Sequence, residues 1–123
     1  MLRQGGGVIV NMASVSGHIA LATIAPYTTS KHGTMGLSKI AAIEYAPRNI
    51  RINSISPGAV DTPMLARGLQ IFGVTPEQAA RDYPIKRIVT PYEIARSVMF
   101  LASDDATEIV GMDLDVTGGY LAG

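Results

Sequence analysis

Residues 7–13 read GVIVNMA, a run rich in β-branched residues that directly follows the glycines at positions 5–7. Valine and isoleucine favour extended backbone, and an apolar run without polar alternation is typical of a strand buried on both faces. We therefore predict a strand over residues 7–13 that is covered on both of its faces. The small and polar residues from Ser14 to Ala25 predict a loop after it.

Helical and extended segments alternate along the rest of the chain. A long helix is expected from about Pro26 to Ala46, because Pro47 disfavours helix in the residue before it. A second strand is expected at residues 50–56 (IRINSIS) and a third at 112–116 (MDLDV). Between them we expect a helix at 63–72, a helix opened by the capping box TPEQ at 75–78, and a helix opened by TPYE at 90–93 that runs to about Ala102.

This order of strands and helices predicts an α/β fold. Strands separated by helical crossovers favour parallel pairing with right-handed connections, so we expect three parallel strands with covering helices. The length of 123 residues predicts one domain over residues 1–123. Ligands of such open sheets bind beyond the carboxyl ends of the strands, which is where candidate site residues must lie.

Composition excludes several classes of function. The 10 basic and 10 acidic residues balance, so no basic face for nucleic acid is expected. The absence of cysteine excludes disulfides and thiol catalysis. The start of the chain lacks the pattern of a secretory signal and no apolar run is long enough for a membrane span, so we expect a cytoplasmic protein. The only histidines are His18 and His32; we expect no metal site, and a solvated loop position for His18, with a contact to substrate from that loop as the alternative.

Three residues that could carry chemistry fall at the expected carboxyl ends. Ser14 follows the first strand, and Tyr27 and Lys31 share one face of the long helix at i, i+4 spacing. An ammonium group near a phenol favours the phenolate, so such a tyrosine can exchange a proton with an alcohol or a carbonyl. A serine hydroxyl can hold the same substrate oxygen. The spacing alone also fits an ordinary pair on a helix surface.

Five segments of the sequence, taken together, favour a catalytic set over an ordinary pair on a helix surface. The chain closely resembles the short-chain dehydrogenase/reductase family at residues 11–17 (NMASVSG), 27–31 (YTTSK), 53–58 (NSISPG), 100–104 (FLASD) and 111–119 (GMDLDVTGG). The order and spacing of the family hold over nearly the whole chain. The resemblance implies the C-terminal half of a Rossmann-like, doubly wound parallel sheet. The glycine-rich pyrophosphate fingerprint has no counterpart, since the glycines at 5–7 precede a strand, so the chain is expected to be a fragment.

The resemblance implies roles for the three residues at the strand ends. Tyr27 would be the catalytic acid/base, and Lys31 would bond the nicotinamide ribose and tune Tyr27, which makes both of them cofactor contacts. Ser14, 13 positions before Tyr27, would orient the substrate.

The resemblance also implies cofactor contacts after the second strand. The positions that would lie against the nicotinamide or hold its carboxamide are Pro57, Gly58, Val60 and Thr62. Residues 64–83 would form the substrate-binding loop, and their apolar composition favours a hydrophobic or cyclic alcohol. Gly33 and Gly36 inside the long helix indicate close packing, either against the sheet or against another subunit, since the family forms oligomers.

The expected function is that of an NAD(P)-dependent oxidoreductase that interconverts a secondary alcohol and a ketone, with a small molecule as its substrate and a homo-oligomer as its assembled state. The alternative is a truncated, non-catalytic fragment that at most associates with a full-length homologue, because the first strand would expose one unpaired edge. The sequence leaves open the substrate, the preference between NAD and NADP, and whether the chain acts alone.

Overall fold

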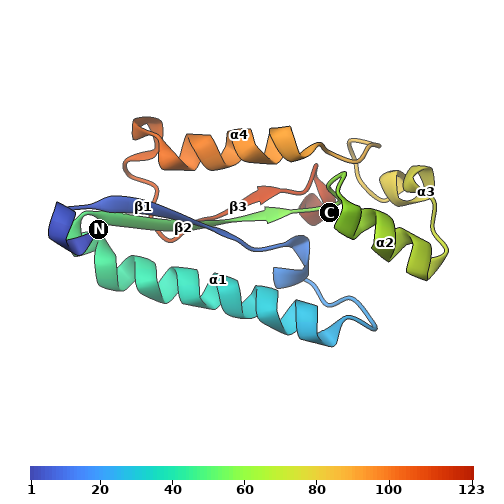
Figure 1. The fold of residues 1–123 in the computed structure, drawn as a ribbon, viewed down its shortest axis with the longest axis horizontal. Helices are drawn as coiled ribbons and strands as arrows, with labels where there is room; N and C mark the ends of the chain where they lie inside the picture. The colour runs from blue at the N-terminus through green and yellow to red at the C-terminus, as the bar shows by residue number, and fades with distance from the viewer.

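Three parallel strands form the centre of the molecule (Figure 1). The structure, a computed structural model, describes residues 1–123. The strands are β1 (Gly7–Met12), β2 (Ile50–Pro57) and β3 (Asp113–Val116), in the order β1-β2-β3 with both pairs parallel. Gly7 lies opposite Ile50, and Pro57 lies opposite Val116. The predicted α/β fold with a three-stranded parallel sheet is confirmed.

Two long helices cover the two faces of this sheet. Helix α1 (Ala25–Tyr45) lies on one face and α4 (Pro91–Ala102) on the other (Figure 1). Shorter helices α2 (Pro63–Phe72) and α3 (Pro76–Arg81) lie beyond the carboxyl end of β2. Short 3-10 turns complete the chain: η1 (Leu2–Gln4), η2 (Val15–Gly17), η3 (Ala46–Arg48), η4 (Asp104–Ala106) and η5 (Tyr120–Ala122). No helix combines the length and the apolar character needed to cross a membrane.

The helix starts follow the predicted signals. At α4, the Glu93 amide donates to Thr90 Oγ1 at 3.3 Å, and the Thr90 amide donates to the Glu93 carboxylate at 2.8 Å. At α3, Thr75 and Gln78 make the same reciprocal pair at 3.2 and 2.8 Å. These bonds satisfy amide groups that the first turn of a helix leaves without partners. Both capping boxes are therefore confirmed.

The strand buried on both faces is β2 rather than β1. Every residue of β2 except Arg51 is buried, whereas β1 is only partly buried and Met12 is exposed. The prediction for β1 was wrong because β1 has a single strand neighbour and forms the edge of the sheet. Apolar side chains pack on both faces of the sheet: Ala42, Ile50 and Ile52 on the α1 side, and Ile55, Ile94 and Leu101 on the α4 side.

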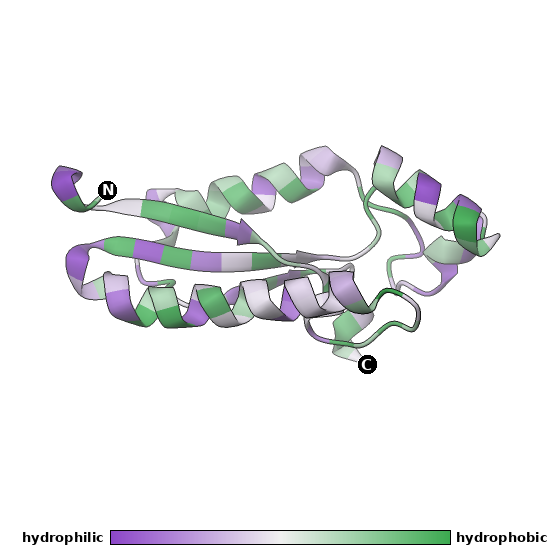
Figure 2. Cartoon of the chain, turned by 60° about the horizontal axis from the view of Figure 1, so that its bottom comes forward, coloured by the Kyte–Doolittle hydropathy of each residue, from purple (hydrophilic) through white to green (hydrophobic).

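Polar residues inside β2 tie the sheet to the segments around it. Figure 2 shows the mixture of hydrophilic and hydrophobic residues along this strand. Asn53 is completely buried; its amide donates to Ile109 O at 2.8 Å and its carbonyl accepts from Met112 N at 2.9 Å. Arg51 donates to two carbonyl oxygens at the end of α4, at 2.8 and 2.9 Å. Satisfied polar groups of this kind fix the path of the chain rather than destabilise the core.

Candidate active site

Ser14 lies in a buried turn just beyond the carboxyl end of β1. The residue is 7% exposed, and its Oγ accepts a hydrogen bond from Ser16 N at 3.1 Å as the cap of turn η2. This bond uses a lone pair of the oxygen and leaves the hydroxyl hydrogen free to donate. The turn therefore presents a fixed donor at the edge of the sheet where ligands of parallel sheets bind.

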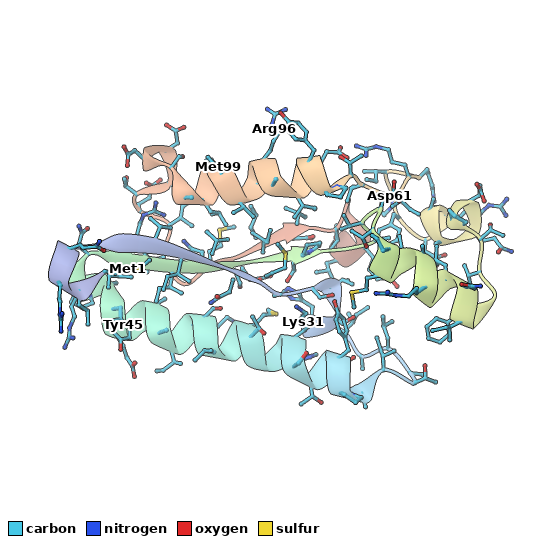
Figure 3. All side chains as sticks on the ribbon, in the orientation of Figure 1. Met1, Lys31, Tyr45, Asp61, Arg96 and Met99 are labelled. Atoms are coloured by element: carbon cyan, nitrogen blue, oxygen red, sulfur yellow. The ribbon has the colours of Figure 1, made fainter.

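Tyr27 and Lys31 lie in the first two turns of α1, at the same end of the sheet. Lys31 Nζ donates to Met12 O at 2.8 Å and lies 5.6 Å from the centroid of the Tyr27 ring. In Figure 3, Lys31 lies between α1 and the end of β1. The last carbonyl of β1 thus holds the ammonium group within reach of the tyrosine ring, on the helical face that the i, i+4 spacing predicts.

Turn η2 packs directly against the part of α1 that carries Lys31. A Cβ atom added to Gly17 would lie 2.5 Å from Met35 Sδ and 3.1 Å from Lys31 O, so a larger residue would have to displace the Met35 side chain and shift the turn away from the Lys31 backbone. Residues 13–17 are all buried. The structure therefore brings the turn that begins at Ser14 and the helical turn of Lys31 into contact.

The predicted cofactor contacts form a turn after β2. Pro57 ends the strand, and a Cβ at Gly58 would lie 2.5 Å from Tyr83 Cε1 and 3.2 Å from Thr117 O. Thr62 caps α2: its Oγ1 accepts from the Leu65 amide at 3.2 Å and donates to Val60 O at 3.2 Å. Figure 3 places Asp61 of this turn beyond the end of β2.

Val60 keeps its own amide free in this turn. It pairs with Val89 in an isolated parallel bridge, in which Val89 N donates to Ala59 O at 3.1 Å and Asp61 N donates to Val89 O at 2.8 Å. This pattern uses the polar groups on either side of Val60, so the Val60 N–H makes no backbone hydrogen bond. A free, fixed N–H at this position is a donor that a carboxamide oxygen can accept.

His18 is an exposed loop residue, as predicted from the sequence, and its imidazole also bonds to the sheet. Its Nε2 lies 2.8 Å from Asp113 Oδ2 and 3.2 Å from Ser56 Oγ. The second carboxylate oxygen of Asp113 accepts a hydrogen bond from Ser54. The exposed loop position is confirmed, but the sequence did not predict the bonds, because Asp113 lies 95 positions from His18. One indication of a polar contact here was present in the sequence: Ser54 and Ser56 lie at i, i+2 spacing in β2, which places both side chains on one face of the sheet.

Tyr83, the last residue of the segment predicted as the substrate-binding loop, makes contacts that the sequence did not predict. Burial raises the pKa of its phenol, and a hydrogen bond from the Ala59 backbone partly opposes that rise in pKa. Its ring lies 5.0 Å from the ring of Tyr120, centroid to centroid. Tyr83 therefore contacts both the turn at Gly58 and the turn at the end of the chain.

Comparison with known proteins places this geometry in a family. The family model described as "Enoyl-(Acyl carrier protein) reductase" matches residues 1–121. A solved oxidoreductase of the short-chain dehydrogenase/reductase family from Burkholderia thailandensis superposes with a TM-score of 0.92 at 36% identity, over 100% of this chain and 48% of that one. The chain belongs to the short-chain dehydrogenase/reductase family.

Two further short-chain dehydrogenase/reductase relatives show the same extent of match. Cyclohexanol dehydrogenase of Acinetobacter sp. (strain SE19) is 42% identical over 98% of this chain and 45% of its own length. A variant of the actinorhodin polyketide ketoreductase, solved with NADPH, superposes with a TM-score of 0.92 at 36% identity, over 98% of this chain and 49% of its own. The chain thus spans about half the length of the relatives it matches, and corresponds to the C-terminal half of the family fold.

Proposed function

We propose that this chain supplies the proton-transfer half of an NAD(P)-dependent oxidoreductase that interconverts a secondary alcohol and a ketone. The observation that carries the proposal is the Lys31 ammonium, which Met12 O holds at 2.8 Å and which lies 5.6 Å from the centroid of the Tyr27 ring, on a helical turn whose backbone contacts the turn that begins at Ser14. A phenol, a cation and a buried hydroxyl at the carboxyl end of a parallel sheet form a set that can protonate and orient a carbonyl oxygen.

Each residue has a distinct task in this proposal. In ketone reduction, the Tyr27 hydroxyl donates its proton to the carbonyl oxygen, and in alcohol oxidation the Tyr27 phenolate takes the proton back. Lys31 stabilises the phenolate by charge attraction. Ser14 donates a hydrogen bond to the reacting oxygen and holds it in place. The nicotinamide cofactor, when bound, donates or accepts the hydride.

The residues around the turn after β2 fit such a cofactor. Lys31 uses one N–H on Met12 O, which leaves two donors for ribose hydroxyl groups. The Val60 N–H makes no backbone bond and can hold the carboxamide, and Thr62 can add its hydroxyl by exchanging its bond to Val60 O. Pro57 and Gly58 would form the surface over which the nicotinamide ring passes.

The substrate class that fits best is a small apolar or cyclic alcohol. Helix α2, which follows the proposed carboxamide contacts, exposes the large apolar side chains of Met64, Ile71 and Phe72. Exposed apolar side chains on a helix that follows the cofactor contacts would suit a hydrophobic substrate. The name of the Acinetobacter relative, cyclohexanol dehydrogenase, supports a cyclic alcohol.

The proposal can be tested in a chimera that restores a complete sheet. The part of the Acinetobacter cyclohexanol dehydrogenase that precedes the matching region is fused in front of this chain, and cyclohexanol oxidation is followed by the absorbance of NADH or NADPH. We expect turnover, and Tyr27→Phe should lower kcat by about 100-fold or more while the cofactor still binds. Tyr92→Phe, at an exposed position of α4, is the matched control. An equally active Tyr27→Phe chimera would refute the proposed role of Tyr27.

A second function, association without catalysis, is favoured by the free edge of β1. Gly7 N donates to Asn49 O, just before β2, and Ala13 N donates to Ile55 O of β2, so the alternation of the strand directs the N–H groups of Val8 and Val10 toward the open edge. An apolar groove of about 770 Å³ lies beside this edge; its lining includes Leu2, Ile9, Ala41, Tyr45 and Ile52. The occupant we propose is the nucleotide-binding half of a homologue.

The two functions differ in what the isolated chain binds. Calorimetric titration of the chain with NADPH should give micromolar affinity if the chain binds cofactor by itself. Co-purification with a full-length homologue, together with no heat from NADPH, would instead support association without catalysis.

A further inference from the structure

The turn that carries Ser14 is held from two sides. On one side Gly17 packs against Met35 and the backbone of Lys31, so the turn cannot move toward α1. On the other side His18, the residue directly after the turn, reaches the sheet and bonds to β2 and β3. Ser14 and His18 therefore flank a short, fully buried segment that is fixed at both of its ends.

The carboxylate that receives His18 is nearly removed from solvent. The Asp113 side chain is 6% exposed and the His18 side chain 30%. Asp113 accepts hydrogen bonds from Ser54 and from His18, and both of these donors lie on the α1 face of the sheet. A nearly buried carboxylate that loses one donor is destabilised, so the Asp113 carboxylate favours one position of the imidazole ring. The pair thus joins a partly exposed imidazole to a nearly buried carboxylate.

We infer that His18 is a positioning residue: its bonds to Asp113 and Ser56 fix the Val15–Gly17 turn and, through it, the hydroxyl of Ser14. The catalytic consequence rests on the proposed function, whereas the fixing of the turn does not. The two side chains to which His18 bonds, Ser56 and Asp113, are not among the proposed catalytic or cofactor-binding residues. The effect of His18 is transmitted through three backbone residues to the group that orients the substrate.

Amide hydrogen exchange on the full 123-residue chain tests the fixing of the turn directly. Ser16 N donates to Ser14 Oγ at 3.1 Å, and Gly17 N donates to Ser14 O at 2.8 Å, so both amides report on the turn. In His18→Ala we expect exchange at these two amides to rise about tenfold or more, while Ser54 N in the sheet keeps its protection. His32→Ala, at the only other histidine, should leave all of these amides unchanged.

Conservative variants separate a positioning role from a general loss of stability. His18→Gln places an amide N–H close to the position of Nε2 and should restore most of the protection. Asp113→Asn keeps the shape but removes the charge; it should shift the Nε2 resonance of His18 and speed exchange at Gly17. Equal acceleration at Gly17 and Ser54, or no acceleration in His18→Ala, would overturn the inference.

The chimera described above tests the catalytic consequence. His18→Ala should lower kcat about tenfold or more, as expected for a displaced substrate-orienting group, with the KM for the oxidised cofactor (NAD+ or NADP+) unchanged and with recovery in His18→Gln. If the unsubstituted chimera shows no turnover, the proposed function is contradicted, but the amide hydrogen exchange result on the Val15–Gly17 turn is unaffected. An active chimera in which His18→Ala has full kcat would defeat the catalytic consequence alone.

Discussion

Two glycines of the candidate site matter because they have no side chain, which lets neighbouring groups pack closely against the backbone. Gly17 allows turn η2 to contact the backbone of Lys31, and Gly58 allows the ring of Tyr83 to lie against the turn after β2. Neither of these two glycines has a positive φ, so the need is for space rather than for an unusual backbone conformation. A methyl group at either position would displace a neighbour that the site depends on.

Gly58→Ala should lower the free energy of unfolding by about 1–3 kcal/mol, the usual cost of overpacking. The added Cβ would lie 2.5 Å from Tyr83 Cε1. Chemical unfolding measures the effect. The same substitution in a Tyr83→Ala background should cost less, because the ring is no longer there to collide with.

Gly68→Ala is the matched control, since a Cβ there meets nothing within 4 Å. An undiminished stability of Gly58→Ala would mean that Tyr83 does not occupy the space above the turn.

At the scale of elements, helix ends are fixed by short local motifs. The capping box of α4 is joined to the segment before it by Arg87, whose guanidinium donates to both Glu93 oxygens at 2.9 and 2.6 Å. The bonds from Arg87, and then those from Thr90, lower the pKa of Glu93 from 4.5 to about 2. A lowered folded-state pKa stabilises the fold above the unfolded pKa, and this contribution is lost as the pH falls through the folded pKa.

Glu93→Gln should therefore reduce Tm most above pH 4.5, with the difference from wild type shrinking toward pH 2. The glutamine can still accept from the Thr90 amide, so the variant removes the charge but not the capping box. Thermal melts at half-unit pH steps measure the difference. Glu44→Gln, at an exposed position of α1, controls for net charge. A difference in Tm that is constant over this range would contradict the assignment.

Unlike Gly17 and Gly58, the two glycines inside helix α1 have no close neighbour. Close packing was predicted for Gly33 and Gly36, yet a Cβ at either position meets nothing within 4 Å. The close-packing interpretation is wrong within this chain, because both positions are exposed. Leu37, Ile40 and Ile43 of the same helix are exposed as well.

Gly36→Ala should raise the free energy of unfolding by about 0.5–1 kcal/mol, since glycine is a poorer helix former than alanine. Urea unfolding of the chain, at a concentration where sedimentation shows a monomer, checks this. A loss of stability would indicate that the face of α1 at Gly36 packs against another molecule.

For the molecule as a whole, the sheet ends on one side at β1. Its outer N–H and C=O groups have no strand partner, and such an edge pairs readily with another chain. The homo-oligomer expected from the family stays a prediction, and the edge of β1 offers a different route to self-association.

Val8→Pro should reduce self-association of the isolated chain, because it removes an outward N–H that β2 does not use. Sedimentation velocity over a tenfold or larger concentration range is the measurement, with wild type associating and the variant shifted toward monomer. Val8→Ala, which keeps the N–H, should associate like wild type. Equal association of all three would exclude this edge as the contact.

The sequence by itself determined the elements and their order. Proline, capping boxes and β-branched runs act within a few residues, so α1, α3, α4 and the three strands lie close to the expected positions. The i, i+4 spacing likewise placed Tyr27 and Lys31 on one helical face, because helical periodicity is a local property.

Only the tertiary structure decided which strand is central and what holds the site together. The burial of β2 rather than β1, and the contacts of His18 with Asp113 and of Gly58 with Tyr83, join residues that are distant along the chain. Such contacts depend on how the helices and strands pack, so they cannot be predicted from the sequence pattern of a single segment. The physical reason is that backbone propensities act over one or two turns, whereas a site at the end of a sheet is assembled from several crossovers.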